Sequence, residues 1–178
     1  MSFSAQAGRV SFAYASDMSL VRVDPGETRW GQQVALLMEP PREDEVRIRV
    51  VATGICHTDL AMRDVDNRVP RPVVLGHEAA GIVEEVGPEV THIAPGDRVV
   101  IPFNISCGHC FMCSQGLQSQ CETTQVRDQG TGAALFGFSE LYGSVPGGQA
   151  EYLRVPQAHF THIKVPEGPA DSRFVYLS

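Results

Sequence analysis

The sequence predicts a mainly β fold, a compact β-barrel or sandwich, on three observations. Apolar side chains recur with a period of two, most clearly over residues 46–51, as expected where successive side chains of a strand point to opposite faces. Glycine and proline recur at short intervals, as at residues 95–96 and 146–148, which favours turns between short strands over repeated βαβ units. Helical patterning is scarce. We expect strands at residues 9–14, 18–23, 46–51 and 151–155.

Two short helices are expected beside these strands. One follows Cys56 through residue 63, and the other begins at Asp171, a suitable N-cap for residues 172–177. The second helix has no glycine or other C-terminal cap before Ser178. A helix that stops without a cap is typical of a chain interrupted inside an element, so we expect a fragment or an isolated domain.

Composition indicates one globular domain and disfavours several classes of partner. The 178 residues include 14 Lys or Arg against 21 Asp or Glu, a formal net charge of −7. This charge repels phosphate backbones and no basic patch offsets it, so we expect no nucleic-acid partner. No apolar run approaches the roughly twenty residues that cross a bilayer, so we expect no membrane association. A secretory signal is not recognisable, and we expect a cytoplasmic protein.

Four of the five cysteines form a cluster with metal-ligand spacing. Cys107, Cys110, Cys113 and Cys121 follow the pattern C-x2-C-x2-C-x7-C. An odd number of cysteines in a reducing compartment favours metal or catalytic thiolates over disulfides. Zn²⁺ accepts four thiolates in a tetrahedral shell, and a shell closed in this way is structural. We therefore predict a structural zinc in a lobe of about residues 104–125.

The cysteines and the nearby histidines allow other interpretations. An iron–sulfur cluster fits less well, because the ferredoxin run continues with x3-Cys-Pro, whereas here seven residues separate Cys113 from the fourth cysteine. His109 could replace one sulfur, but a solvated loop histidine is favoured while four thiolates are present. His159 and His162 have no third ligand nearby in sequence and favour surface or packing roles.

The fifth cysteine and a His-Glu pair lie at two predicted strand boundaries. Cys56 follows the alternating strand, and His77 and Glu78 come about twenty residues later, before another stretch of small residues. Taken singly, His77 would be a structural histidine and Cys56 a small buried apolar side chain. Their occurrence together weakens both of these separate interpretations.

These motifs together resemble a known enzyme family. The segments GICHTDL, GHEAAGIVEEVG, PGDRVV and SCGHCFMC occur in the same order in the catalytic domain of the zinc-dependent medium-chain alcohol dehydrogenases. The resemblance runs from about Glu45 to the end of the chain. It implies a GroES-like β-barrel catalytic domain with a zinc-binding lobe, over residues 1–178, without the Rossmann nucleotide-binding domain.

The resemblance also implies roles for individual residues around two zinc ions. Cys56 and His77 would be ligands of a catalytic zinc that Glu78 can approach, and the four clustered cysteines would hold the second, structural zinc. An ordinary solvated charge remains the alternative for Glu78, since a carboxylate beside a ligand is often not itself bound to the metal.

Three residues after Cys56 match further functional positions of the family. Thr58 matches the hydroxyl that relays the substrate proton, Asp59 the carboxylate that orients the metal-binding histidine, and His57 a position near the cofactor pyrophosphate. The alternative for Thr58 and Asp59 is a helix start with local backbone hydrogen bonds. The chain departs from the family pattern at Ala61, where many relatives place a relay histidine, so the full proton relay is in doubt.

From residue 101 the resemblance narrows to the glutathione-independent formaldehyde dehydrogenase and dismutase branch. In that branch a third catalytic ligand follows a Leu-Ser pair, and this chain ends at the corresponding Ser178. Residues 130–135, GTGAAL, lack the third glycine of a dinucleotide fingerprint and are interpreted as a loop. We therefore expect this chain alone to be inactive.

The expected function is a zinc-dependent oxidoreductase domain that interconverts alcohols and aldehydes, with hydride transfer to NAD or NADP. A small alcohol or aldehyde would be the substrate, and a homo-oligomer is expected for the complete enzyme. The alternatives are a zinc-stabilised binding module without catalysis and a degenerate relic of an enzyme. The sequence determines neither the substrate nor the choice between NAD and NADP.

Overall fold

The computed structural model describes residues 10–13, 20–23, 38–64, 74–130, 132–166 and 174–177. The chain divides into two compact units, Met1–Pro40 and Pro41–Ser178. In the first unit, strands β1 (Val10–Ala13) and β2 (Leu20–Val23) pair antiparallel, with Val10 opposite Val23. The two N-terminal strands predicted from the sequence are thus confirmed.

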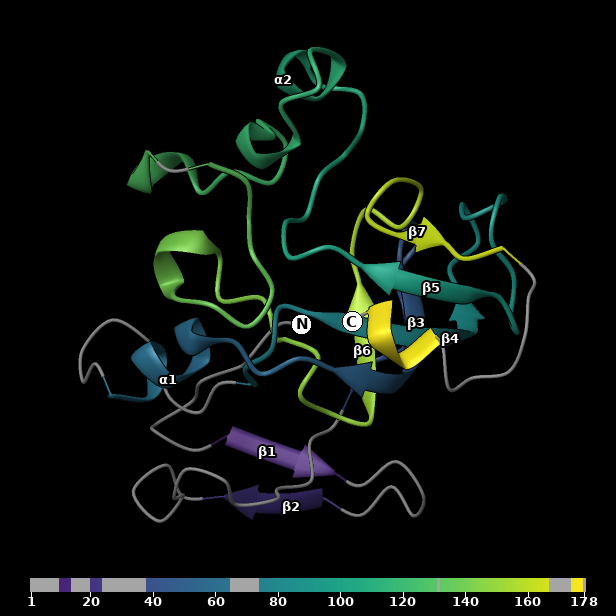
Figure 1. Ribbon diagram of the computed structural model, residues 1–178, viewed down its shortest axis with the longest axis vertical. Coiled ribbons are helices and arrows are strands. Elements are labelled where there is room, and N and C mark those ends of the chain that lie inside the picture. The colour runs from purple at the N-terminus through teal and green to yellow at the C-terminus, as the bar shows by residue number, and fades with distance from the viewer. Residues whose placement is uncertain are drawn as a thin grey trace. The chain divides into compact units, whose positions relative to one another are not determined.

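The second unit is built on one five-stranded antiparallel sheet in the order β6-β3-β4-β5-β7 (Figure 1). Every neighbouring pair of strands is antiparallel, so the mainly β class predicted from the sequence is confirmed. The central pair is the longest, and both of its strands have eight residues. The strands are β3 (Val46–Thr53), β4 (Ala79–Val86), β5 (Arg98–Ile101), β6 (Tyr152–Val155) and β7 (Ile163–Lys164).

Helices are short in the described residues. The helix predicted after Cys56 is α1 (His57–Asp64). The remaining elements are α2 (Phe111–Ser114) and the 3-10 turns η1 (Gln118–Gln120), η2 (Arg127–Gln129), η3 (Glu140–Tyr142) and η4 (Phe174–Leu177).

Two further sequence predictions concern the C-terminal segment and a glycine-containing segment. The C-terminal helix is a 3-10 turn, η4, that contacts β3 and β4, and its predicted N-cap Asp171 lies outside the described residues. The glycine-containing segment follows the 3-10 turn η2, and its described residues, 130 and 132–135, contain no helix or strand beyond an isolated bridge from Leu135 to Asn104. These residues form a loop, as predicted.

The core of the second unit explains the alternating pattern. Val46 and Ile48 in β3 are fully buried. Arg49, on the opposite, solvent-facing side of β3, forms an ion pair with Glu84 of β4, with 3.2 Å between Arg49 Nε and Glu84 Oε1. Side chains of a strand alternate between faces, so one face packs and the other carries charge. The buried apolar residues of this core are Val46, Ile48, Ala79, Val83, Val90, Ile93, Val99, Ile101, Ile105, Ala134, Phe136, Leu153, Val155 and Ala158.

The junction of β3 and β4 positions the functional residues. The register between these strands shifts between Val50 and Ala52, and Gly81 opposite passes so close that a Cβ there would lie 2.7 Å from the Arg49 carbonyl oxygen. Just beyond the shift, the Glu78 carbonyl oxygen accepts hydrogen bonds from Thr53 Oγ1 at 2.8 Å and from the Gly54 nitrogen at 3.2 Å. The end of β3 and the start of β4 are therefore held side by side.

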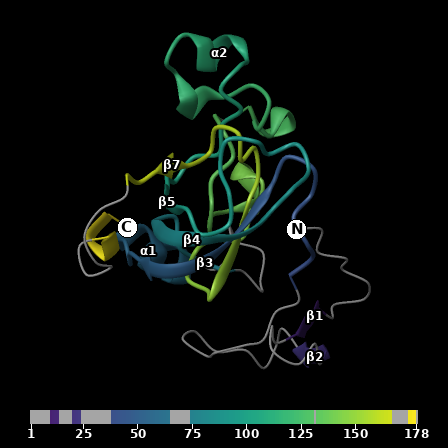
Figure 2. The ribbon, with the colours of Figure 1, turned by 90° about the vertical axis from the view of Figure 1, so that its right-hand side faces the viewer.

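A lobe extends from the sheet at α2 (Figures 1 and 2). It contains the four clustered cysteines, and its chain leaves β5 and returns toward Leu135. No helix among the described residues has the length and apolar character needed to cross a membrane.

A buried ion pair joins the start of β3 to its neighbour β6. Glu45, just before β3, and Arg154 in β6 are each 5% exposed, and Glu45 Oε2 lies 3.2 Å from Arg154 Nε. The same carboxylate oxygen accepts the backbone N–H of Arg42 at 3.0 Å. Burial lowers the pKa of the Arg154 guanidinium, so this cation depends on its carboxylate partner.

We expect the Glu45→Gln variant to lower the free energy of unfolding by about 3 kcal/mol, because it removes the carboxylate charge that lies 3.2 Å from a buried guanidinium. The matched control is Lys164→Gln, which removes the exposed pair between Lys164 Nζ and Asp97 Oδ2 at 2.8 Å and should cost less than about 1 kcal/mol. Chemical denaturation of both variants measures the difference. Equal costs would show that burial of the Glu45 pair is energetically unimportant.

Candidate metal centres

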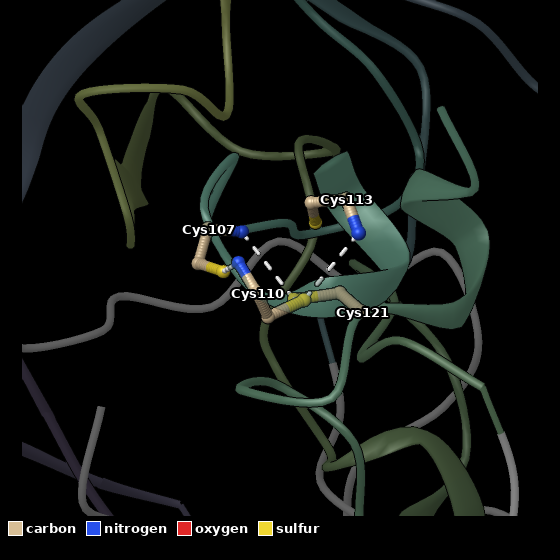
Figure 3. A group of neighbouring side chains, drawn as sticks. All are labelled: Cys107, Cys110, Cys113 and Cys121. Atoms are coloured by element: carbon tan, nitrogen blue, oxygen red, sulfur yellow. Dashed lines mark hydrogen bonds between the residues drawn. The ribbon is translucent and has the colours of Figure 1, made fainter. Parts of the chain in front are cut away.

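The four clustered cysteines form one compact group of sulfurs (Figure 3). Their Sγ atoms all lie within 4.8 Å of one another, and Cys110 Sγ is 3.9 Å from Cys121 Sγ. A tetrahedral shell with Zn–S distances of about 2.3 Å separates its sulfurs by about 3.8 Å. All four are free cysteines. The group therefore has the geometry of a four-sulfur site for a single ion.

The local backbone directs its N–H groups at these sulfurs. The Cys110 nitrogen donates to Cys107 Sγ at 3.3 Å, and the Cys113 nitrogen donates to Cys110 Sγ at 3.5 Å, at the start of α2. Cys121 Sγ accepts from the Cys107 nitrogen at 3.4 Å. N–H groups that point at sulfur stabilise the thiolate, the form that binds metal.

The sulfurs do not share one electrostatic environment. The hydrogen bond from the Cys113 backbone N–H lowers the pKa of Cys110 to about 6. Burial raises the pKa of Cys113 to about 12. Four thiolates this close repel one another, so a bound cation would be needed to keep all of them ionised.

The lobe has little apolar core of its own. The buried cluster around α2 consists of the cysteines and Ala133, while Phe111 on α2 is 66% exposed. A segment that buries so little apolar surface does not offset the entropy of ordering its chain. We therefore expect the order of the lobe to depend on what the sulfurs bind.

Two histidines form hydrogen bonds with the backbone of the four-cysteine group. His109 Nδ1 and His159 Nε2 both donate to the Cys107 carbonyl oxygen, at 2.9 and 2.6 Å, and their rings stack with centroids 5.7 Å apart. His109 is exposed and lies outside the group of sulfurs. The predicted loop role of His109 and packing role of His159 agree with this placement.

His162 has a separate packing role. Its ring stacks on His92 with a centroid distance of 5.1 Å, and burial lowers the pKa of His162. No sequence pattern indicated that His159 contacts Cys107 or that His162 stacks on His92, because the partners are far apart along the chain.

The second candidate metal group combines a residue that follows β3 with two residues that precede β4. Cys56, His77 and Glu78 each offer a ligand atom, and these atoms lie within 4.8 Å of one another. Cys56 precedes α1, and the other two residues precede β4. All three side chains are half-buried. The structure thus brings together the two segments that the sequence motifs had singled out.

Asp59 lies behind His77 in this group. Asp59 is 4% exposed, and its Oδ1 lies 3.5 Å from His77 Nδ1. Both atoms are buried, and neither has a hydrogen-bond partner within the described part of the chain. Because Nδ1 faces the carboxylate, Nε2 is the ring nitrogen left for a metal. Asp59 also makes the local helix-start bond, from its nitrogen to the Cys56 carbonyl oxygen at 3.0 Å.

The other predicted residues lie around the same group. Thr58 Oγ1 is 3.4 Å from Cys56 Sγ, whereas His57 is exposed at the first residue of α1. Gly54 leaves room for Glu78, because a Cβ at position 54 would collide with the Glu78 carboxylate. A sulfur, an imidazole and a carboxylate suit zinc, and three protein donors leave a coordination position open.

Gln149 is a residue of this group that the sequence did not reveal. Its Nε2 donates to Asp59 Oδ2 at 3.1 Å, from ninety residues further along the chain. The glycines before it marked a turn, but nothing in the sequence placed that turn next to Asp59.

The geometry agrees with comparisons to known proteins. Residues 42–167 match the family model described as the alcohol dehydrogenase GroES-like domain. The chain belongs to this family. It is therefore a member of the zinc-dependent medium-chain alcohol dehydrogenases, as the motifs indicated, and the family shares its mainly antiparallel fold.

Individual relatives support the same assignment. The chain is 51% identical over 129 residues to the uncharacterized zinc-type alcohol dehydrogenase-like protein AdhB of Bacillus subtilis, covering 71% of this chain and 33% of that protein. It is 42% identical over 125 residues to a glutathione-independent formaldehyde dehydrogenase of Pseudomonas aeruginosa, covering 70% and 30%. The chain spans about a third of the length of these relatives.

A solved structure shows the same likeness. The alcohol dehydrogenase TADH from Thermus sp. ATN1 superposes with a TM-score of 0.67 and 29% sequence identity, covering 94% of this chain and 43% of that one.

We expect removal of metal from the four-cysteine group to unfold residues 104–125 before the sheet, because the lobe has so little apolar core of its own. Hydrogen exchange measured with and without a strong chelator should show protection lost in the lobe and retained in β3 and β4. A lobe whose protection survives complete metal removal would contradict this expectation.

Proposed function

We propose that this chain is the catalytic domain of a zinc-dependent oxidoreductase that interconverts a small alcohol and its aldehyde, with hydride transfer to NAD or NADP. The observation that carries the proposal is the convergence of Cys56, His77 and Glu78 within 4.8 Å, with Asp59 behind His77. The family of the chain supports it, since the matched relatives include proteins named as alcohol and formaldehyde dehydrogenases.

Cys56 and His77 would hold the catalytic zinc, with Glu78 close enough to approach it. When bound, zinc supplies a Lewis acid that lowers the pKa of a substrate hydroxyl. Asp59 would keep the His77 ring oriented. The half-buried hydroxyl of Thr58, beside Cys56 Sγ, would accept the substrate proton and pass it outward. His57, exposed at the start of α1, would face the cofactor pyrophosphate.

The four cysteines would hold a second zinc with a different purpose. Four thiolates close the coordination shell, so this site would stabilise the lobe and take no part in the reaction. A binding module or a catalytic relic would need only this zinc. Residues 104–125 contain no Lys or Arg, which disfavours a nucleic-acid-binding lobe.

Metal content separates the catalytic proposal from these alternatives. We expect the complete enzyme, which is the intact protein in the experiments that follow, to bind two zinc ions per chain, as measured by elemental analysis. Cys56 should be protected from alkylation until one of these ions is removed. Cys56→Ser should lose one zinc and keep the lobe folded. A single zinc in the wild-type protein, with Cys56 alkylated promptly, would instead identify a module or a relic.

Thr58 provides the test of the proton path. In the intact protein, Thr58→Val should lower kcat/KM for alcohol oxidation by about 10²- to 10⁴-fold, because proton transfer from the substrate loses its acceptor. Zinc content should not change. Thr58→Ser, which keeps the hydroxyl, is the matched control and should retain most of the activity. Similar losses in both variants would assign Thr58 a packing role.

A further inference from the structure

Gln149 bridges the two segments that form the mixed group, which is the group of Cys56, His77 and Glu78. Its backbone nitrogen donates to the Leu75 carbonyl oxygen at 2.9 Å, and the Gly148 nitrogen donates to the Gly76 carbonyl oxygen at 2.8 Å. The turn before β6 thus runs along the residues that lead directly into His77. On its other side the Gln149 amide reaches Asp59 in α1.

The backbone of Gln149 is fixed by a close approach. Gly76 has a φ of +99°, and a Cβ there would lie 2.6 Å from the Gln149 nitrogen. Only glycine accepts both this dihedral angle and this contact. The position of residue 149 beside the His77 segment is therefore set by the main chain, independently of its side chain.

The Gln149 side chain completes the hydrogen bonding of one Asp59 oxygen. Asp59 Oδ2 accepts from the Cys56 nitrogen at 2.9 Å and from Gln149 Nε2 at 3.1 Å. An ionised carboxylate only accepts, so the amide must donate. With Oδ2 held by two donors, rotation of the carboxylate is restricted, and Oδ1 stays 3.5 Å from His77 Nδ1.

We propose that Gln149 is a positioning residue of the metal group: its amide holds the Asp59 carboxylate in the orientation that keeps the proton of His77 on Nδ1 and leaves Nε2 for zinc. The inference rests on the proposed function for the role of zinc. The residue acts through Asp59 and touches neither the substrate nor the metal. Partners of this kind set the tautomer and basicity of a ligating histidine.

The Gln149→Met variant tests the proposal. It removes the amide donor, keeps a long unbranched side chain, and leaves the backbone bond to Leu75 in place. In the intact protein, zinc affinity of the mixed group should fall about 10-fold, while the four-cysteine group keeps its zinc. Competition with a chelator measures both sites in one sample.

A second readout does not require bound zinc. After mild chelation of the mixed group alone, ¹⁵N NMR of neutral His77 should show the Nδ1–H tautomer in the wild-type protein and a several-fold larger share of Nε2–H in Gln149→Met. A variant within twofold of wild type in both zinc affinity and tautomer ratio would overturn the proposal.

Gln157→Met is the matched control. Gln157 Nε2 donates to Asp44 Oδ2 at 2.9 Å, an equivalent amide–carboxylate bond outside the metal group, and its loss should change neither readout. Equal effects in both variants would mean general destabilisation and would overturn the proposal. In an Asp59→Asn background, Gln149→Met should add no further loss of affinity, and an additive loss would contradict action through Asp59.

The two readouts separate this inference from the proposed function. If the mixed group binds no zinc but the His77 tautomer depends on Gln149, the oxidoreductase proposal fails and the positioning role stands. If zinc binds and neither readout responds to Gln149→Met, the positioning role fails and the oxidoreductase proposal stands.

Discussion

Two hydrogen bonds accepted by the Glu78 carbonyl oxygen bring the residues of the mixed group together. By accepting from Thr53 Oγ1 and from the Gly54 nitrogen, this oxygen joins the end of β3 to the start of β4. Cys56 follows one strand and His77 precedes the other, so this junction sets the distance between them. Gly54 is part of the same constraint, since any side chain there would displace the Glu78 carboxylate.

The two cysteine-containing groups differ in how their residues are brought together. In the lobe, the backbone bonds from Cys110 and Cys113 to sulfur span three residues, so the group is mainly local and has little apolar core behind it. The residues of the mixed group instead flank β3 and β4, the central strands of the packed sheet. A closed shell contributes folding energy, whereas an open one requires a scaffold that is already stable.

Asp59 connects the chemistry of the mixed group to the fold. It is a buried carboxylate, and such a group is costly unless donors surround it. The Cys56 nitrogen and Gln149 both donate to Oδ2. The other carboxylate oxygen, Oδ1, is the one that lies next to His77. Asp59 makes the local hydrogen bonds of a helix start and also lies beside the His77 ring. Its role in orienting that imidazole stays a prediction.

The sequence by itself predicted four of the strands (β1, β2, β3 and β6), α1 and the four-cysteine group, because alternation and ligand spacing are local along the chain. The family motifs likewise identified Cys56, His77 and Glu78 as candidates. The sequence could not determine the 3-10 form of η4, the bracing of Cys107 by His159, or the contact of Gln149 with Asp59. These depend on strand register and on glycine-permitted close approaches between distant segments. Only the packed sheet decides which distant side chains meet, since a shift of one residue in register would turn them to the opposite face.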